Sequence, residues 1–123
     1  MRDIQRVLEL WGAWAANDTC NIYFASVAAG FKGLLPQTSK TRITCSDDDG
    51  LIIEGCMARL LEKRPYDYNI LVGHYVYMIP KRQLAKKLKK SEKQIRIEIM
   101  LAEGFVEGCL SILGTKLEMD FLI

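Results

Sequence analysis

The sequence predicts an all-α fold, a small helical domain, from two observations. Apolar residues recur at spacings of three and four along several separate segments, which is the period of amphipathic helices. Residues that favour a helix start stand in front of several of these segments, namely Ser46, Pro65, Pro80 and Ser91. With 123 residues, of which 50% are hydrophobic, the chain is expected to fold as a single domain over residues 1–123.

The first third of the chain predicts one clear helix, one weaker helix and a loop. An apolar stripe with polar residues opposite it predicts a helix from Ile4 to near Asn17. Residues 21–29 favour a short second helix, on weaker grounds because small and aromatic side chains are mixed there. Residues 30–45 contain two glycines, a proline and several hydroxyl side chains, so they are predicted to form a loop between helices.

Two further helices are predicted in the middle of the chain. Ser46 and the triplet Asp47–Asp49 place capping and negative groups ahead of an apolar stripe that stops before Pro65. A divalent metal site at the triplet is the alternative, which we rank below capping. Pro65 suits the first turn of the next helix, predicted to run to about Met78, and the sole histidine, His74, is interpreted as a structural residue.

Several classes of function are excluded by what the sequence lacks. The four cysteines contain no C-x-x-C pair, which argues against a zinc ribbon or a redox motif. There is no nucleophile–base pair, phosphate loop or metal-ligand spacing, so we expect no enzyme, no cofactor and no metal. No apolar run reaches the length of a membrane span or of a signal-peptide core, so we expect a cytosolic protein with no membrane partner.

Positive charge is concentrated in one segment. Residues 81–96 contain eight basic residues and one acidic residue, a net charge of +7, whereas the rest of the chain has nine basic and 14 acidic residues, a net charge of −5. Release of counterions from phosphates favours grouping lysine and arginine on one face. This asymmetry predicts a local nucleic-acid surface, although a solvated helical face is the simpler alternative for any basic run.

The same segment predicts a helix-turn-helix that lies between Lys81 and Met100, within residues 80–100. Small Ala85 suits a close crossing of two helices, and Lys89–Ser91 suits the turn between them. Ser91 and Gln94 match a capping box for the second helix. That second, recognition helix is expected to be long, because its apolar stripe continues through Ile95, Ile99, Ala102, Val106, Cys109, Leu110 and Leu113. The first helix is expected to lock onto it through Leu84 and Leu88, which meet Ile95.

Double-stranded DNA is the partner that this motif predicts. At the start of the recognition helix, Glu92, Lys93 and Arg96 are residue types that read base edges, with Ser91 at its tip and Ile97 suited to a thymine methyl group. The other basic side chains are expected to bind phosphates, which fixes register without reading sequence. These predicted phosphate contacts are Lys81, Arg82, Lys86, Lys87, Lys89 and Lys90.

Segments spread over nearly the whole chain form a recognisable set. They are the opening residues 1–9 with Trp11-Gly12-Ala13-Trp14-Ala15, residues 28–34, Cys45 with Asp47–Asp49, residues 102–105, residues 107–110 and residues 117–120. With these segments the chain resembles the compact class of lambdoid phage antitermination protein Q. Two positions depart from the family: Met78-Ile79-Pro80 replaces a glycine and a hydroxyl cap, and Cys45-Ser46 replaces adjacent cysteines, which weakens any metal proposal there.

The resemblance implies a transcription antitermination factor acting in the host bacterial cytoplasm, at the nucleoid. Such a factor binds a site at a phage late promoter, loads onto paused RNA polymerase holoenzyme with its sigma factor, and alters the RNA exit channel so that termination is suppressed. The resemblance allows either one or two copies of the protein on the DNA site. Nascent RNA would be threaded nearby, and Lys32, Lys40 and Arg42 of the predicted loop are candidates to face it or the polymerase, with a plain structural loop as the alternative.

Two other functions stay open at this point. A conventional helix-turn-helix regulator would use the same motif and never travel with polymerase. A helical interaction module would instead use aromatic residues such as Trp11, Trp14 and Phe31 against a partner, and its binding would survive mutation of the basic segment.

Overall fold

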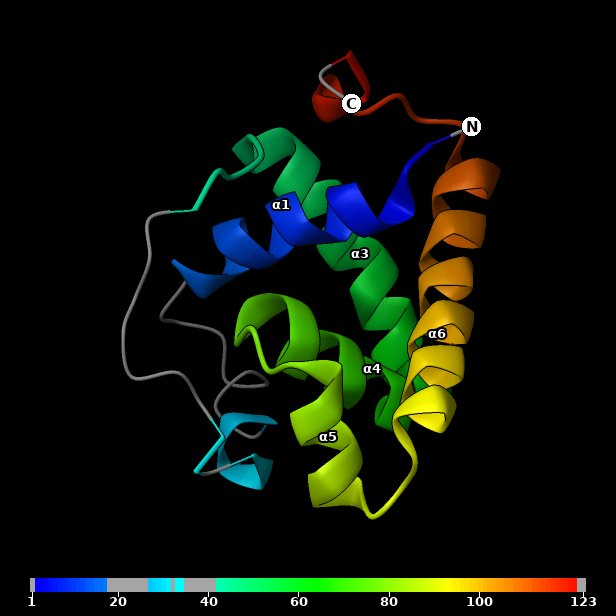
Figure 1. Cartoon of the computed structure of the whole chain (residues 1–123). Helices are drawn as coiled ribbons and strands as arrows, with labels where there is room; N and C mark the ends of the chain where they lie inside the picture. The colour runs from blue at the N-terminus through cyan, green and yellow to red at the C-terminus, as the bar shows by residue number, and fades with distance from the viewer. Residues whose placement is uncertain (1, 18–26, 32, 35–41, 122–123) are drawn as a thin grey trace.

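Helices form all of the regular structure in the part of the chain that a computed structural model describes, residues 2–17, 27–31, 33–34 and 42–121. The all-α prediction is therefore confirmed (Figure 1). No helix within these ranges is both long and apolar enough to cross a membrane. The elements are α1 (Ile4–Ala16), α3 (Asp47–Lys63), α4 (Pro65–Leu71), the π-helical η1 (Val72–Val76), α5 (Lys81–Leu88), α6 (Glu92–Leu113) and the short 3₁₀ helix η2 (Glu118–Phe121).

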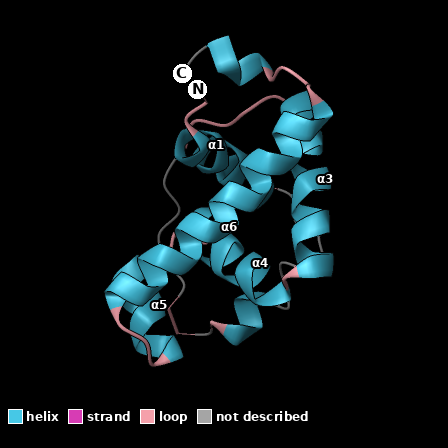
Figure 2. Ribbon diagram, turned by 90° about the vertical axis from the view of Figure 1, so that its right-hand side faces the viewer, coloured by secondary structure: helices cyan, strands magenta, loops and turns pink. Residues whose placement is uncertain are grey.

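Helix α6 is the element on which the others converge. It contacts α1, α3, α4 and α5, and it runs along one whole side of the molecule (Figures 1 and 2). Its predicted apolar stripe is buried at Ile95, Ile99, Ala102, Val106 and Leu110, whereas Cys109 is half-buried. Leu113 was expected in the stripe but is 59% exposed; it is the last residue of α6, which is capped by Gly114.

Helix α1 forms where the sequence predicts it. Asp3 caps its start by accepting a hydrogen bond from the Arg6 amide at 3.2 Å, and Asn17 ends it. The stripe that contains Val7, Leu8 and Trp11 is fully buried.

Helix α1 crosses η1 so closely that the crossing requires a glycine. A Cβ atom built on Gly12 would lie 2.1 Å from the carbonyl oxygen of Tyr75, which is well inside contact distance. The Tyr75 hydroxyl donates to the carboxylate of Glu103, a buried residue of α6. Burial, and then this hydrogen bond, raise the pKa of Tyr75 above its ordinary value. Three helices are thus joined at this point.

The weaker second helix and the loop are only partly within the described residues. Residues 27–30 form one helical turn, closed by a hydrogen bond from the Phe31 amide to the Val27 carbonyl at 3.2 Å, whereas residues 18–26 lie outside the described ranges. Of the predicted loop, residues 42–45 have no regular structure, and residues 35–41 lie outside the described ranges.

The three aspartates at the start of α3 are placed differently from one another. The cap is Ser46, whose hydroxyl accepts from the Asp49 amide at 3.2 Å, as the sequence predicts. Asp47 accepts from the Trp14 indole at 2.8 Å, and Asp48 is exposed. Buried Asp49 accepts from the amides of Glu118 and Met119, each at 2.9 Å, so it anchors the C-terminal segment.

The prediction of one helix from Pro65 to about Met78 is wrong for the second half of that segment. It begins at Pro65, but after Leu71 the backbone widens into a π-helix that ends at Val76. Two hydrogen bonds close the widened turn: the Tyr77 amide donates to the Val72 carbonyl, and the Ile79 amide donates to the Gly73 carbonyl. Met78 then takes a left-handed φ of 58°, which turns the chain toward α5.

The two ends of the described chain lie side by side (Figure 1). Arg2 Nε and Nη2 bind the two carboxylate oxygens of Asp120 at 2.9 and 3.0 Å, a paired geometry that favours the charged form of both groups. The Arg2 hydrogen bond lowers the pKa of Asp120. Because the folded pKa is depressed, this pair stabilises the fold above about pH 4 and loses its effect as the pH falls below that value.

Candidate nucleic-acid interface

Helices α5 and α6 are joined by a tight three-residue turn at the place predicted from sequence. Lys89 ends α5 in a left-handed conformation, with φ 58° and ψ 45°. Its amide bonds to the Lys86 carbonyl at 3.4 Å, and the Lys90 amide bonds to the Ala85 carbonyl at 2.9 Å. These two bonds form a Schellman motif, which satisfies the last carbonyls of α5 and reverses the chain within three residues.

The packing between the two helices also agrees with the sequence. Leu84 and Ile95 are completely buried, Ala85 is buried at the crossing, and Leu88 is half-buried at the rim. The small side chain of Ala85 lets the helices approach, and the leucines fill the angle between them. The exposed positions of α5 and of the first turn of α6 carry polar or charged side chains.

Lys89 is an unusual choice for a left-handed position, which glycine normally occupies. We expect Lys89→Gly to stabilise the protein by about 0.5 to 1 kcal/mol, because the Cβ strain is removed. A thermal melt followed by circular dichroism measures this change. Lys86→Gly, inside α5, is the matched control and is expected to destabilise by about 1 kcal/mol. A Lys89→Gly variant that melted below the parent protein would contradict the described turn.

The start of α6 is capped, but only half of the predicted capping box forms. The Ser91 hydroxyl accepts from the Gln94 amide at 3.1 Å, as expected. The Gln94 side chain does not reach back to the Ser91 amide: its Nε2 donates to Glu98 Oε2 at 2.9 Å. The carboxylate four residues ahead gives the Gln94 NH₂ group a charge-assisted hydrogen bond, which is stronger than the neutral bond between Gln94 and the Ser91 N–H that the capping box would have formed.

Glu98 is the centre of a polar cluster that the sequence analysis missed. Its carboxylate accepts from the Tyr66 hydroxyl at 2.6 Å and from Lys90 Nζ at 2.9 and 3.1 Å. Lys90 also lies 4.4 Å above the centre of the Tyr66 ring. Burial alone would raise the pKa of Glu98, but the hydrogen bonds from Lys90, Tyr66 and Gln94 outweigh it and lower the pKa. The turn is thereby fixed to α4 as well as to α6.

The predicted DNA-binding side chains fall into three groups. Those of Arg82, Lys86, Lys87, Lys89 and Lys93 are exposed around the turn and the adjacent ends of α5 and α6. Lys81 is half-buried, and Lys90 is engaged with Glu98 and Tyr66. Exposed Arg96 pairs with Glu92 one turn earlier at 2.7 Å. The geometry therefore brings most of the predicted residues to one end of the molecule, where α5 and the start of α6 lie (Figure 1).

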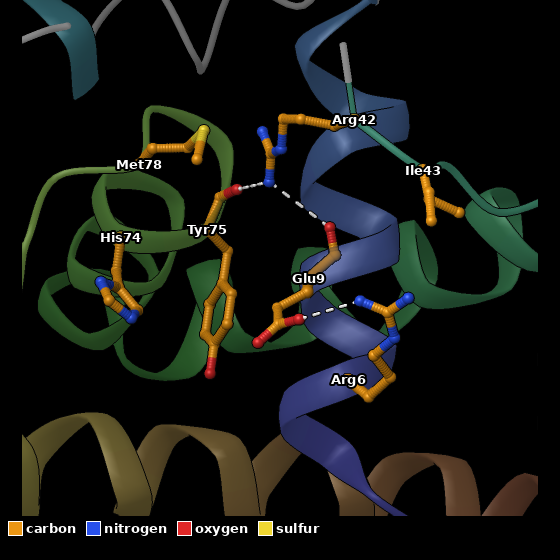
Figure 3. A pocket seen from close by; sticks show the side chains of 7 residues that line it. All are labelled: Arg6, Glu9, Arg42, Ile43, His74, Tyr75 and Met78. Atoms are coloured by element: carbon orange, nitrogen blue, oxygen red, sulfur yellow. Dashed lines mark hydrogen bonds and ion pairs between the residues drawn. The ribbon is translucent and has the colours of Figure 1, made fainter. Parts of the chain in front are cut away.

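Arg42, predicted to face RNA or polymerase, is placed differently. It lines a pocket of about 410 Å³ between α1 and η1 with Arg6, Glu9, His74 and other side chains (Figure 3). Its guanidinium donates to backbone carbonyls of Tyr75 at 2.6 Å, Val76 at 3.2 Å and Glu9 at 3.4 Å. These bonds satisfy carbonyls at the end of η1, so Arg42 is a structural residue. Lys32 and Lys40 lie outside the described residues.

His74, in the same pocket, is also structural, as the sequence suggested. Its Nδ1 lies 2.9 Å from the Ile79 carbonyl, which only accepts, so Nδ1 carries the proton. Burial lowers the pKa of His74 and outweighs the opposing effect of this hydrogen bond. A neutral His74 thus holds the segment that leads into α5.

Comparison with known proteins places this architecture in a family. The family model described as phage antitermination protein Q matches residues 1–118. Antitermination protein Q of Escherichia phage 933W is 47% identical over 120 residues, which are 98% of this chain and 83% of that protein. The prophage antitermination protein Q homolog QuuD of Escherichia coli (strain K12) is 46% identical over 123 residues, which are 100% of this chain and 97% of that protein.

The fold is shared with solved structures as well. Transcription antitermination factor Q21 in complex with Q21-binding-element DNA aligns with a TM-score of 0.67 and 19% identity, covering 90% of this chain and 91% of that one. A second Q21 structure aligns with a TM-score of 0.68 and 21% identity, covering 88% and 86%. The sequence relatives and the family model together establish that the chain belongs to the phage antitermination protein Q family.

Proposed function

We propose that this protein is a phage transcription antitermination factor that binds a DNA site at a late promoter through α5, the turn and the start of α6. It then loads onto paused bacterial RNA polymerase holoenzyme in the host cytoplasm and suppresses termination by altering the RNA exit channel. The observation that carries the DNA-binding part is the Schellman turn between α5 and α6, surrounded by exposed basic side chains. Family membership and the Q21–DNA complex support the same assignment.

The DNA contacts divide by chemistry. Four exposed basic residues flank the turn, and their side chains make no hydrogen bond or ion pair to another described residue, so we assign them to phosphates. These are Arg82, Lys86, Lys87 and Lys89. Half-buried Lys81 is a peripheral contact of the same kind. We do not assign Lys90 to a phosphate, because its ammonium already donates hydrogen bonds to Glu98 and Tyr66.

Base reading belongs to the first turns of α6. Ser91, Glu92, Lys93 and Arg96 lie at its exposed N-terminal end. The Glu92–Arg96 ion pair is solvent-exposed and contributes little to stability, so it opens at low cost. Once open, Arg96 is free for a guanine edge and Glu92 for a cytosine amine.

Polymerase and RNA contacts rest on the family alone. Arg42 is withdrawn as an RNA-facing residue, because its guanidinium is used by backbone carbonyls. Lys32 and Lys40 remain candidates. Titration of the cognate duplex to saturation also shows whether one or two copies of the protein occupy the DNA site.

Arg96→Ala is expected to weaken binding to the cognate site by about 1 to 3 kcal/mol and to relax preference at one base pair. Lys87→Ala is the matched control: it removes a phosphate contact, so all sequences should lose affinity similarly and the salt slope should fall by about one unit. Titrations of cognate and scrambled duplexes at several salt concentrations measure both effects. If Lys87→Ala changed base preference and Arg96→Ala did not, the placement of α6 on DNA would be wrong.

The whole function is tested by single-round transcription with bacterial RNA polymerase on the cognate late promoter, followed by an intrinsic terminator. Readthrough that requires both the protein and its upstream DNA site is the expected result. Binding with unchanged termination would make the protein a conventional regulator. Readthrough that persisted after deletion of the DNA site would contradict loading from DNA.

A further inference from the structure

We propose that Gln94 is an additional base-reading residue of α6, that it reads adenine, and that Glu98 is the positioning residue which orients its amide. The inference rests on the proposed function, because it requires that the start of α6 lie in the major groove. It adds a contact outside the set predicted from sequence, in which Gln94 had only a capping role.

The orientation of the Gln94 amide follows from the chemistry of its partner. Nε2 lies 2.9 Å from Glu98 Oε2. An ionised carboxylate only accepts hydrogen bonds, so the amide nitrogen, and not the oxygen, must face Glu98. The carbonyl oxygen Oε1 and the second Nε2 hydrogen are then directed elsewhere, and Gln94 is an exposed residue.

Glu98 is itself held in place, which an ordinary surface glutamate is not. Its side chain is only 12% exposed and receives hydrogen bonds from three side chains on three different parts of the fold. Tyr66 comes from α4, Lys90 from the turn and Gln94 from α6. Because the hydrogen bonds keep Glu98 ionised at neutral pH, the acceptor that orients Gln94 persists under binding conditions.

The groups left over on Gln94 match one base. Adenine presents an N6 amine and an N7 acceptor in the major groove, and a glutamine amide binds both through its oxygen and one amide hydrogen. Gln94 keeps that pair available because Glu98 uses only one hydrogen of Nε2. Gln94 directly follows Lys93 in the first turn of α6, so a helix that enters the groove by its N-terminal end brings Gln94 to the groove on the flank next to Lys93. Glu92 and Arg96 lie on the other flank of the helix.

A merely structural role for Gln94 predicts something different. A hydrogen bond between exposed residues four apart on a helix adds about 0.2 to 0.5 kcal/mol to stability. Its loss would lower the melting temperature slightly and leave base preference unchanged. Base preference is therefore the readout that separates the two roles.

The test is selection of bound sequences from a randomised duplex library with the full chain, comparing parent, Gln94→Met, Glu98→Gln and Lys87→Ala. At one position of the selected sequence, we expect Gln94→Met to reduce the preference for adenine over the other bases by about 5- to 150-fold. The preferences at the other positions should not change. Glu98→Gln, which no longer dictates which end of the Gln94 amide faces it, should relax that same position in part. Lys87→Ala should leave the selected sequence unchanged.

The outcomes distinguish this inference from the function on which it rests. A parent protein that selects no sequence overturns the proposed function. A parent that selects a sequence which Gln94→Met does not alter overturns the reading role of Gln94. A Glu98→Gln variant that melts like the parent and keeps full preference overturns the positioning role, and Tyr66→Phe replaces it if Glu98→Gln fails to fold.

Discussion

A Gly12→Ala variant is expected to melt about 10 °C below the parent protein, which corresponds to a loss of about 3 kcal/mol of unfolding free energy. The new Cβ atom would lie 2.1 Å from the Tyr75 carbonyl oxygen and 3.2 Å from Arg42 Nη2. Since the near neighbour is backbone, no rotamer change relieves the overlap, and α1 must move away from η1. The movement also disturbs the Arg42 hydrogen bond to that carbonyl.

Gly104→Ala is the matched control for this experiment. Gly104 lies inside α6, is exposed, and has nothing within 4 Å of its would-be Cβ among the described residues. Alanine there should stabilise the helix by about 0.5 to 1 kcal/mol. Opposite signs for the two variants would support the close α1–η1 crossing, and a Gly12→Ala protein as stable as the parent would rule it out.

Asp49→Asn is expected to cost about 2 to 3 kcal/mol, although the two side chains have the same shape. The Asp49 carboxylate accepts from the amides of Glu118 and Met119, one on each oxygen, in a buried position. An asparagine offers only one oxygen, so its NH₂ group faces a backbone N–H and leaves that donor without a partner. The C-terminal segment should therefore loosen.

Thermal melting and hydrogen exchange at the amides of residues 118 and 119 measure this effect together. Both amides should exchange faster in Asp49→Asn, because protection depends on the bonds that hold them. Asp48→Asn, at an exposed position one residue earlier, should change neither measurement. Equal protection in the two variants would mean that the anchor lies elsewhere.

The sequence predicted best those features that depend on neighbours along the chain. Ser46 and Ser91 cap α3 and α6, and Pro65 starts α4, because each acts within one helical turn of itself. The burial of Leu84 and Ile95 in one core cluster was also predictable, since the helix period and a short turn direct both side chains inward.

Features that depend on distant partners were not predictable in this way. Arg42 belonged to a basic loop by sequence, yet the carbonyls that bind it come from Glu9, Tyr75 and Val76. Lys90 was counted with the free lysines because Tyr66 lies 24 residues away in the chain. The π-helix after Leu71 likewise depends on packing against α1, which the three-and-four spacing of that segment does not encode.

The pairing of Arg2 with Asp120 has a practical consequence for anyone who labels this protein. The pair lies where the two chain ends meet, at the end of the molecule opposite α5 and the turn that joins it to α6 (Figures 1 and 2). An affinity tag or a fluorophore attached beside either residue would sit far from the surface assigned to DNA. A protein tethered to a surface in this way would expose α5 and the start of α6 to duplexes in solution.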